Sequence, residues 1–397
     1  MRRVIISSIL ILAFILAGTT IAVLYAKGYR FGPQNGKTFI EGTGLLVVTS
    51  KPEGARVLIN GHLTTATNNT INLAPGTYSI AIEKDGYVSW KKQITVKKEV
   101  VTEATALLFP TAPKLEAVTT TGAANPVMDP TNTLLAYTVS SASAAKNGIY
   151  LLDMNATPII TIGGGITQLT NNSIDRFSEA ELSFSPDGKN LLAQITNLGG
   201  ITSYLLSTSG FNNAPQDVTT TLDQVQKEWE AQSNEKNKKI LDSFSRGTRQ
   251  LALTYFKDLA PSLDGTRILY TASVSGTLDV VKSPKIIGGN STPETRTVKQ
   301  GSVYVYDIKD DRNFLIFEAS KQLTPKFTWQ ADSAHLVYVV DSKINVIEYD
   351  GTNATTVYAG PFLDSFVFPW TDGLSLVMLT KLNNPSVPYN LYRIGLR

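Results

Sequence analysis

The sequence contains no cysteine and only two histidines among its 397 residues. The missing cysteines exclude disulfides, thiol nucleophiles and thiolate metal sites, and two histidines exclude most His-based catalysis and metal binding. Charged residues are also scarce, at 17% against roughly 25% in an average soluble protein. The net charge is only +3, which is too small to indicate a nucleic-acid-binding face.

The chain does contain enough apolar residues to build cores. Hydrophobic residues make up 42% of the sequence, and the length corresponds to two or three domains at about 150 residues each. Its 29 glycines and 18 prolines are an ordinary share, so the chain is neither collagen-like nor of low complexity.

A long uncharged run opens the chain. Residues 4–26 carry no charge, and as a helix they span roughly 34 Å, enough for a bilayer core of about 30 Å. We predict a single transmembrane helix over 4–26, with residues 1–3 in the cytoplasm. The basic residues on its two sides nearly balance, so we predict an extracytoplasmic bulk from the Thr/Asn-rich region that follows. A cleaved signal peptide is the alternative, although its apolar region is usually only about 7–15 residues.

A small β module follows the apolar run. Residues 27–43 are rich in glycine and polar side chains and predict a short linker. From Gly44 onward, short alternating segments are separated by turn signals such as Asn60-Gly61. This pattern predicts a small sandwich of antiparallel strands over 44–108.

The motifs of this module are specific. The letters P-E-G-A stand at 52–55, and V-L-I-N-G, L-A-P-G-T-Y and K-D-G-Y-V-S-W follow in order. The pattern resembles the PEGA domain, and the resemblance implies an extracytoplasmic spacer or interaction module, not an enzyme. Tyr87 and Trp90 either form an exposed aromatic patch that contacts a ligand, or pack in the core, which is the commoner fate of such side chains.

The remaining residues, 113–397, carry an internal repeat. Five copies of an Asp-containing turn each have a strand before them and two strands after them. The turn residues are Asp129, Asp187, Asp264, Asp332 and Asp372. The shortest spacing, between the last two, matches the period of about 40–45 residues of a four-stranded propeller blade. We predict a mostly β chain with a β-propeller of about five blades, and the longest interval leaves a sixth blade open.

One copy of the repeat carries a family resemblance. The letters S-P-D-G-K at 185–189 precede an apolar strand and resemble the repeat of Tol-type β-propellers, which also occur beside serine peptidases. The nucleophile elbow G-x-S-x-G of those peptidases is absent from this sequence. The last copy lacks a fourth strand, and we predict that 114–120 supplies it, because this segment resembles the fourth strands expected at 167–170 and 321–324.

Two stretches interrupt the β pattern. In 220–246, Thr221 and Gln224 predict a capping box and Gly247 predicts a helix end. This long or broken amphipathic helix either packs on the propeller edge or docks a partner, for which Trp229 is the candidate contact. Residues 279–300 predict a long hairpin loop, and loops of such length are often functional.

Familiar catalytic patterns do not appear. His62 follows a turn and His335 begins a strand, and both are predicted to be exposed. Residues 307–311 lack the Ca²⁺-binding spacing D-x-[DN]-x-[DN]-G and predict a hairpin turn. Residues 163–165 lack the Lys and Ser/Thr of a phosphate-binding loop. We therefore assign no catalytic, cofactor-binding or metal-binding residue.

The sequence as a whole predicts a membrane-anchored, extracytoplasmic binding or scaffold protein of the cell envelope, whose propeller loops engage a protein or a glycan. The alternative is a hydrolase or lyase of envelope glycan, because paired carboxylates at the central channel need neither His nor Cys. Two inward-facing carboxylates about 5–10 Å apart would support the enzyme. The ligand, the partner and the oligomeric state do not follow from the sequence.

Overall fold

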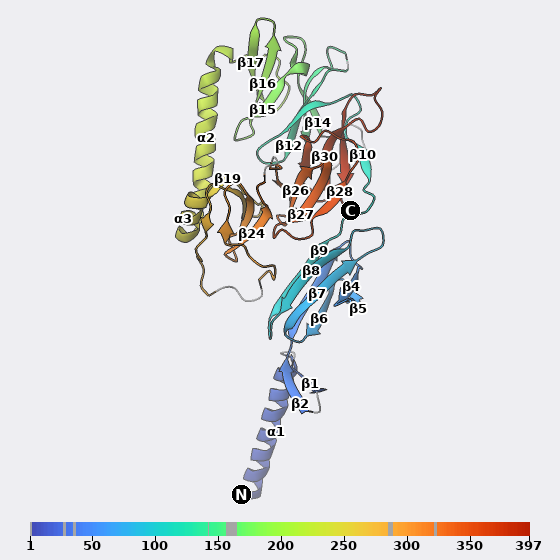
Figure 1. Ribbon diagram of the computed structural model, residues 1–397, viewed down its shortest axis with the longest axis vertical. Helices are drawn as coiled ribbons and strands as arrows, with labels where there is room; N and C mark the ends of the chain where they lie inside the picture. Colours follow the sequence, from blue (N-terminus) through green and yellow to red (C-terminus); the bar gives the residue numbers. More distant parts are fainter. Residues whose placement is uncertain are drawn as a thin grey trace. The chain divides into compact units, whose positions relative to one another are not determined.

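The structure is a computed structural model of the chain, mostly β, with 43% strand and 16% helix (Figure 1). It describes residues 2–26, 29–34, 37–141, 143–155, 165–284, 289–320 and 324–397. The chain forms two compact units. The first contains Met1–Leu108 with Pro284–Pro293, and the second contains Phe109–Ser283 with Glu294–Arg397.

The first unit begins with the apolar helix α1 (Arg2–Ala26). Residues Ile6–Leu24 are long and apolar enough to cross a membrane, and none of that window is buried in the protein. A membrane anchor and a signal sequence share these properties, whereas the core helix of a soluble protein is mostly buried.

A hairpin occupies the segment that the sequence predicts as a linker. Its strands are β1 (Tyr29–Gln34) and β2 (Lys37–Gly42), which pair in antiparallel fashion. Tyr29 lies opposite Gly42, so the chain leaves the hairpin beside the point at which it entered.

Two sheets then form the predicted β-sandwich, in the strand orders β6-β3-β9 and β5-β4-β7-β8. The strands are β3 (Gly44–Lys51), β4 (Arg56–Ile59), β5 (His62–Ala66), β6 (Asn69–Leu73), β7 (Gly76–Glu83), β8 (Trp90–Val96) and β9 (Val101–Leu107). Alternate side chains of β3, such as Leu46 and Val48, are fully buried against Ile80 and Ile82. The sandwich is not wholly antiparallel as predicted, because β3 and β9 run parallel.

The same unit includes a short piece of the later chain. The backbone N–H of Thr95 in β8 donates a hydrogen bond to Ser291 Oγ at 2.9 Å. Ser291 belongs to the predicted loop 279–300, of which residues 285–288 lie outside the described residues.

Five antiparallel four-stranded sheets make up the second unit, and they are the five predicted blades. Blade 1 has β11 (Ala124–Met128), β12 (Leu134–Val139), β13 (Gly148–Asp153) and β14 (Ile166–Asn171), and blade 2 has β15 (Glu181–Phe184), β16 (Asn190–Asn197), β17 (Gly200–Ser207) and β18 (Gln216–Asp217). Blade 3 has β19 (Phe256–Pro261), β20 (Arg267–Ala272), β23 (Val303–Asp307) and β24 (Arg312–Phe317), and blade 4 has β25 (Thr328–Trp329), β26 (His335–Val340), β27 (Lys343–Glu348) and β28 (Thr355–Tyr358). Blade 5 has β29 (Val367–Pro369), β30 (Ser375–Thr380), β31 (Asn390–Gly395) and β10 (Leu115–Ala117).

Blade 5 joins the two ends of this unit. Strand β10 pairs with β31, with Leu115 opposite Ile394, so the prediction that 114–120 completes the last blade is confirmed. The fourth strand of blade 3 is β24, which precedes the predicted segment 321–324. Residues 321–323 of that segment lie outside the described residues, as do residues 163–164 of the glycine run.

The turn between the first two strands has the same hydrogen bonds in every blade. In blade 2 the N–H of Ser185 donates to Asn190 O, and the N–H of Gly188 donates back to Ser185 O, both at 2.9 Å. In blade 1, Asp129 takes the place of Ser185, and Asn132, with a positive φ of 57°, takes that of Gly188. The predicted equivalence of Asp129 with Asp187 is therefore wrong by two residues.

Apolar side chains pack several blades face to face. Trp370 of blade 5 lies in one buried cluster with Leu135 of blade 1, and similar clusters join blade 1 to blade 2 and blade 3 to blade 4. The other face of blade 3, with Ile268 and Tyr270, packs instead against Leu251 of helix α3 (Arg246–Tyr255). The short hairpin of β21 (Gly276–Thr277) and β22 (Thr297–Val298) covers the rest of that face.

The helical insertion differs from the prediction. It contains the 3₁₀ turn η2 (Thr219–Thr221), α2 (Leu222–Asp242) and α3, and these helices fill the interval in which a sixth blade was considered. A second 3₁₀ turn, η1 (Phe177–Glu179), precedes blade 2. The Thr221 side chain makes no capping bond to α2. Gly247 lies in the first turn of α3 and does not end a helix. A Cβ there would approach Val281 Cγ1 to 2.6 Å, so glycine permits the close packing of α3 on the insertion.

Candidate interaction site

Strand direction places the connections of each blade at two ends. Because neighbouring strands are antiparallel, the turns after the first and third strands lie at one end, and the connections after the second and fourth strands lie at the other. Both long insertions, 218–255 and 273–302, start from the second kind of connection. They meet on the face of blade 3 that α3 covers. We call this face the wall of the propeller and take it as the candidate interaction site.

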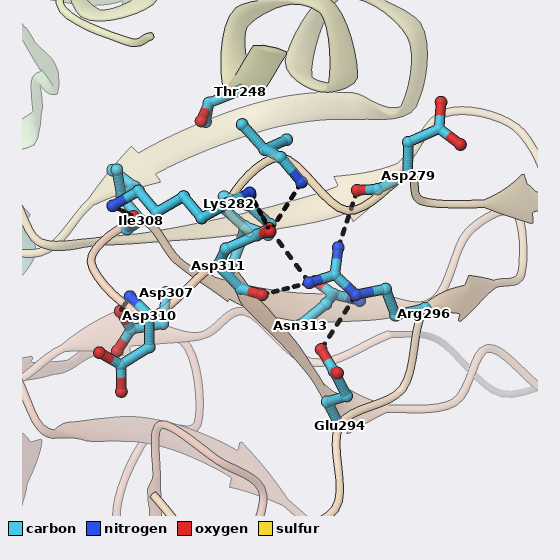
Figure 2. Close-up of polar contacts among 12 residues, drawn as sticks. Thr248, Asp279, Lys282, Glu294, Arg296, Asp307, Ile308, Asp310, Asp311 and Asn313 are labelled. Atoms are coloured by element: carbon cyan, nitrogen blue, oxygen red, sulfur yellow. Dashed lines mark hydrogen bonds and ion pairs between the residues drawn. The ribbon is translucent and has the colours of Figure 1, made fainter. Parts of the chain in front are cut away.

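Asp311 fastens the second insertion to blade 3. Its side chain, only 1% exposed, ends the turn between β23 and β24. The carboxylate Oδ2 accepts the backbone N–H groups of Val281 and Lys282 at 2.7 and 2.8 Å (Figure 2). The other oxygen, Oδ1, accepts the Tyr306 hydroxyl at 2.6 Å and lies 3.1 Å from Arg296 Nη2. Burial by itself raises the pKa of Asp311, but these donors outweigh burial and hold its pKa below the ordinary value.

Arg296 is the cationic partner of this carboxylate. Its side chain is 13% exposed, and its Nε lies 3.0 Å from the Glu294 carboxylate. Nη1 donates to the carbonyl oxygen of Asp279 at 2.8 Å, and Nη2 also donates to the carbonyl oxygen of Asp311. One guanidinium therefore ties both arms of the insertion to the turn of blade 3 (Figure 2).

Two further contacts hold the insertion along its length. Lys282 Nζ donates to the carbonyl oxygens of Ile308 and Lys309 at 2.8 and 2.9 Å. On the outer strand β24, Asn313 exchanges two bonds with Thr295, which join Asn313 O to Thr295 N and Asn313 Nδ2 to Thr295 O, each at 2.7 Å. The predicted loop 279–300 is thus bonded to the blade on both sides of residues 285–288.

Stacked aromatic rings form the wall behind the insertion. The ring centroids of Phe256 and Tyr270 are 3.6 Å apart, and Tyr304 stacks on Tyr270 at 5.6 Å. Tyr306 meets Phe256 at a centroid distance of 5.7 Å with its ring tilted by 55°. Each tyrosine hydroxyl has a partner, as in the 2.9 Å bond from Tyr270 to Asn313 Oδ1. Burial raises the pKa of Tyr270 and of Tyr306 far above the ordinary value, so both remain neutral hydrogen-bond donors.

Arg267 links blade 3 to blade 4. Its guanidinium lies 3.8 Å from the centroid of the Tyr349 ring and donates to Ser333 O at 2.9 Å. It also lies 3.1 Å from the carboxylate of Asp307. Burial nevertheless raises the pKa of Asp307, because the bonds from Arg267 and from the Asp310 amide offset only part of the desolvation.

His335 is buried, at 7% exposed, so the predicted exposed position is wrong. Its Nδ1 lies 2.6 Å from Asp332 Oδ2, and its ring meets the edge of Phe109 at a centroid distance of 5.9 Å. Burial raises the pKa of Asp332, but His335 and the local N–H groups outweigh it and hold the pKa below the ordinary value. The sequence missed this environment because Phe109 comes from a segment more than 200 residues away.

The three candidate contact residues lie in different settings. Trp90 is 4% exposed and belongs to the core of the sandwich, and Tyr87 packs against the same core from a half-buried position. Trp229 is half-buried on α2, a helix in which no residue is buried. The structure does not bring Trp229 together with the other two, so a role in partner contact stays a prediction for each.

The turn carboxylates bond mainly to their own turns. Asp187 accepts the Ser185 hydroxyl at 2.6 Å and Asp264 accepts the Ser262 hydroxyl at the same distance. The Ser185 hydroxyl and the Lys189 amide lower the pKa of the exposed Asp187. Within the described ranges, no group of three or more His, Asp or Glu side chains is arranged to hold a metal ion. Residues 307–311 form the predicted hairpin turn between β23 and β24.

The comparisons with known proteins bear on the first unit most directly. Residues 43–111 match the PEGA domain. This match extends over the sandwich and agrees with the resemblance carried by its motifs. No curated protein gives a significant match to the chain.

The comparison with solved structures matches two TolB proteins and a β-propeller domain at low identity and low TM-score. Putative TolB from Agrobacterium tumefaciens is 14% identical, with 70% of this chain and 73% of that chain covered and a TM-score of 0.21. TolB from Acinetobacter baumannii is 14% identical, with 80% and 59% covered and a TM-score of 0.23. The β-propeller domain of the Trilobed protease from Pyrococcus furiosus is 10% identical, with 89% and 95% covered and a TM-score of 0.21. The propeller assignment rests instead on the five four-stranded sheets of the second unit.

Proposed function

We propose that this chain is a membrane-anchored, extracytoplasmic scaffold of the cell envelope, which binds a protein partner through helix α2 at the insertion-bearing wall of its propeller. The observation that carries the proposal is α2 itself. It is 21 residues long and no residue in it is buried, whereas the neighbouring helix α3 buries Leu251 and Ala252 against blade 3.

The rigid wall supports a binding role. The Asp311 and Arg296 contacts use charged groups to fix the insertion in place, and the aromatic stack behind them is tightly packed. Rigid scaffolds that present surface elements are a common arrangement for binding sites. The apolar residues Leu222, Val225 and Trp229 lie three and four positions apart on α2, as the contact face of a docking helix requires.

Location can be tested on intact cells. Because the chain has no cysteine, the variant Glu230→Cys carries a single thiol on the exposed surface of α2. A membrane-impermeant maleimide should label it in intact spheroplasts as strongly as in lysed cells. Labelling only after lysis would contradict the extracytoplasmic location.

Partner binding needs a matched pair of variants. Photo-crosslinking of the full-length chain from α2 in envelope membranes should give a discrete product. That product should be lost in Trp229→Ala and kept in Gln232→Ala, which changes an exposed residue of the same helix. Equal crosslinking of both variants, with both proteins folded by circular dichroism, would reject α2 as the binding element.

A further inference from the structure

One end of the sandwich lies next to the segment that leaves helix α1. Strands β3 and β7 begin at this end, and β6 and β8 finish there, with Gly44 opposite Leu73 and Gly76 opposite Val96. The end consists of residues 42–44, 74–75 and 97–100, and we call it the base of the sandwich.

The hairpin β1–β2 keeps the base close to the end of α1. An extended linker over 27–43 would reach about 60 Å. Because Tyr29 pairs with Gly42, only residues 27–28 and one strand pairing separate Ala26 from the base. The distance from the Cα atom of Ala26 to that of Thr43 is therefore limited to three residue steps of about 3.8 Å, one strand pairing of about 5 Å and one more step. These add up to at most roughly 20 Å.

The residues that follow the hairpin are bonded to the turn between β8 and β9. The N–H of Glu99 donates to Thr43 O, and the N–H of Leu45 donates to Val100 O, both at 3.0 Å. Gly44 is closely covered, because a Cβ there would collide with Lys97 O and approach Val96 Cγ1 to 2.5 Å. These bonds hold residues 43–45, which directly follow the hairpin, against the turn at 97–100.

The exposed side chains of the base suit a lipid headgroup layer. Lys97 and Lys98 are both exposed in the turn between β8 and β9. Val101, directly after that turn, is a large apolar residue that is 51% exposed, and Ala74 and Pro75 form the exposed turn beside it. Helix α1 has 25 residues, so at about 1.5 Å each it exceeds a hydrocarbon core of about 30 Å and ends among the headgroups.

We infer that the base of the sandwich rests on the membrane that α1 enters, with Lys97 and Lys98 against the phosphates of anionic lipids. The inference rests on the proposed membrane anchoring of α1. The sandwich then lies directly on the membrane surface, where each lysine strengthens binding to anionic lipid by about fivefold. With one exposed acidic residue, Glu99, beside two lysines, the turn has a net charge of +1, which still favours anionic lipid.

Lipid quenching of a single fluorophore tests the inference. The full-length, cysteine-free chain would carry Ala74→Cys at the base, or Glu53→Cys at the opposite end of the sandwich as the position control, and would be reconstituted in vesicles with a headgroup-attached quencher. In vesicles of phosphatidylcholine with phosphatidylglycerol, the label at residue 74 should be strongly quenched and the label at residue 53 should not. In pure phosphatidylcholine the quenching at residue 74 should fall.

A charge comparison then assigns the effect to the lysines. The double variant K97Q/K98Q should lower the quenching at residue 74 in anionic vesicles to the level in neutral ones, whereas K91Q/K92Q, on the same β8 strand but away from the base, should leave it unchanged. Absence of quenching at residue 74 while the protein still floats with the vesicles would overturn the inference and leave the anchoring intact. Failure to float would overturn both. Equal effects of the two double variants would also overturn it.

Discussion

Replacing Asp311 with asparagine should release the second insertion from blade 3. The substitution keeps the size of the side chain and tolerates the positive φ of 50° at this position. It does not keep the hydrogen bonds. Oδ2 of the aspartate faces two N–H donors, from Val281 and Lys282, and Oδ1 faces two more, from Tyr306 and Arg296. Asparagine has only one acceptor atom, so its NH₂ group must face two donors in either orientation.

The size of the effect follows from burial. The Asp311 side chain is 1% exposed and that of Arg296 is 13% exposed, so the substitution leaves two buried donors unpaired and removes the buried one of the two carboxylates beside the guanidinium, leaving Glu294. Removing one partner of such a buried pair costs about 3–5 kcal/mol. If the propeller unfolds as one unit, this corresponds to a fall in Tm on the order of 10 °C.

Limited proteolysis and thermal unfolding of the full-length protein measure the two consequences. In Asp311→Asn, trypsin should cut quickly after Lys282 and Arg296, and Tm should fall. The matched control is Asp310→Asn in the same turn, because the Asp310 contact with Asp307 uses the backbone N–H, which the substitution keeps. If the two variants have the same Tm and the same cleavage rate, Asp311 does not fasten the insertion and the reasoning is refuted.

Three other predictions follow from the same structure. The folded-state pKa of Asp311 is lowered, so its ionised form stabilises the fold above about pH 4. This stabilisation is lost as the pH falls through the folded-state pKa. When Tm is measured at decreasing pH, Tm should therefore fall less in Asp311→Asn than in the parent protein. In a denaturant titration, Gly44→Ala should lower the stability of the sandwich by roughly 2 kcal/mol or more, because the new Cβ would meet backbone atoms. Gly76→Ala, whose new Cβ would have no atom nearer than 3.7 Å, should lower it by less than about 1 kcal/mol in the same titration. Deleting residues 114–117 removes the outer strand of blade 5, so hydrogen exchange should speed up in β31 while blade 3 stays protected; uniform exchange in both blades would contradict this.

Local and repeating features were readable from the sequence. The apolar helix α1 can be predicted from the absence of charged residues alone. The sandwich follows from the alternation of apolar and polar residues and from pairs such as Asn60-Gly61, which favour tight turns. The five blades follow from a turn that recurs with a strand on each side. Even the closure by β10 could be predicted, because an incomplete last repeat leaves one strand position that only a similar segment can fill.

Tertiary structure decided the features that depend on contacts between distant residues. The two amides that Asp311 Oδ2 accepts lie about 30 residues before it, and Phe109 reaches His335 from another part of the chain. The parallel pair β3–β9 and the covering of blade 3 by α3 are likewise non-local. Periodicity reports which side of a strand or helix is apolar, but it does not report what packs there. The buried charges, the candidate wall and the base of the sandwich therefore emerged only when the chain was folded.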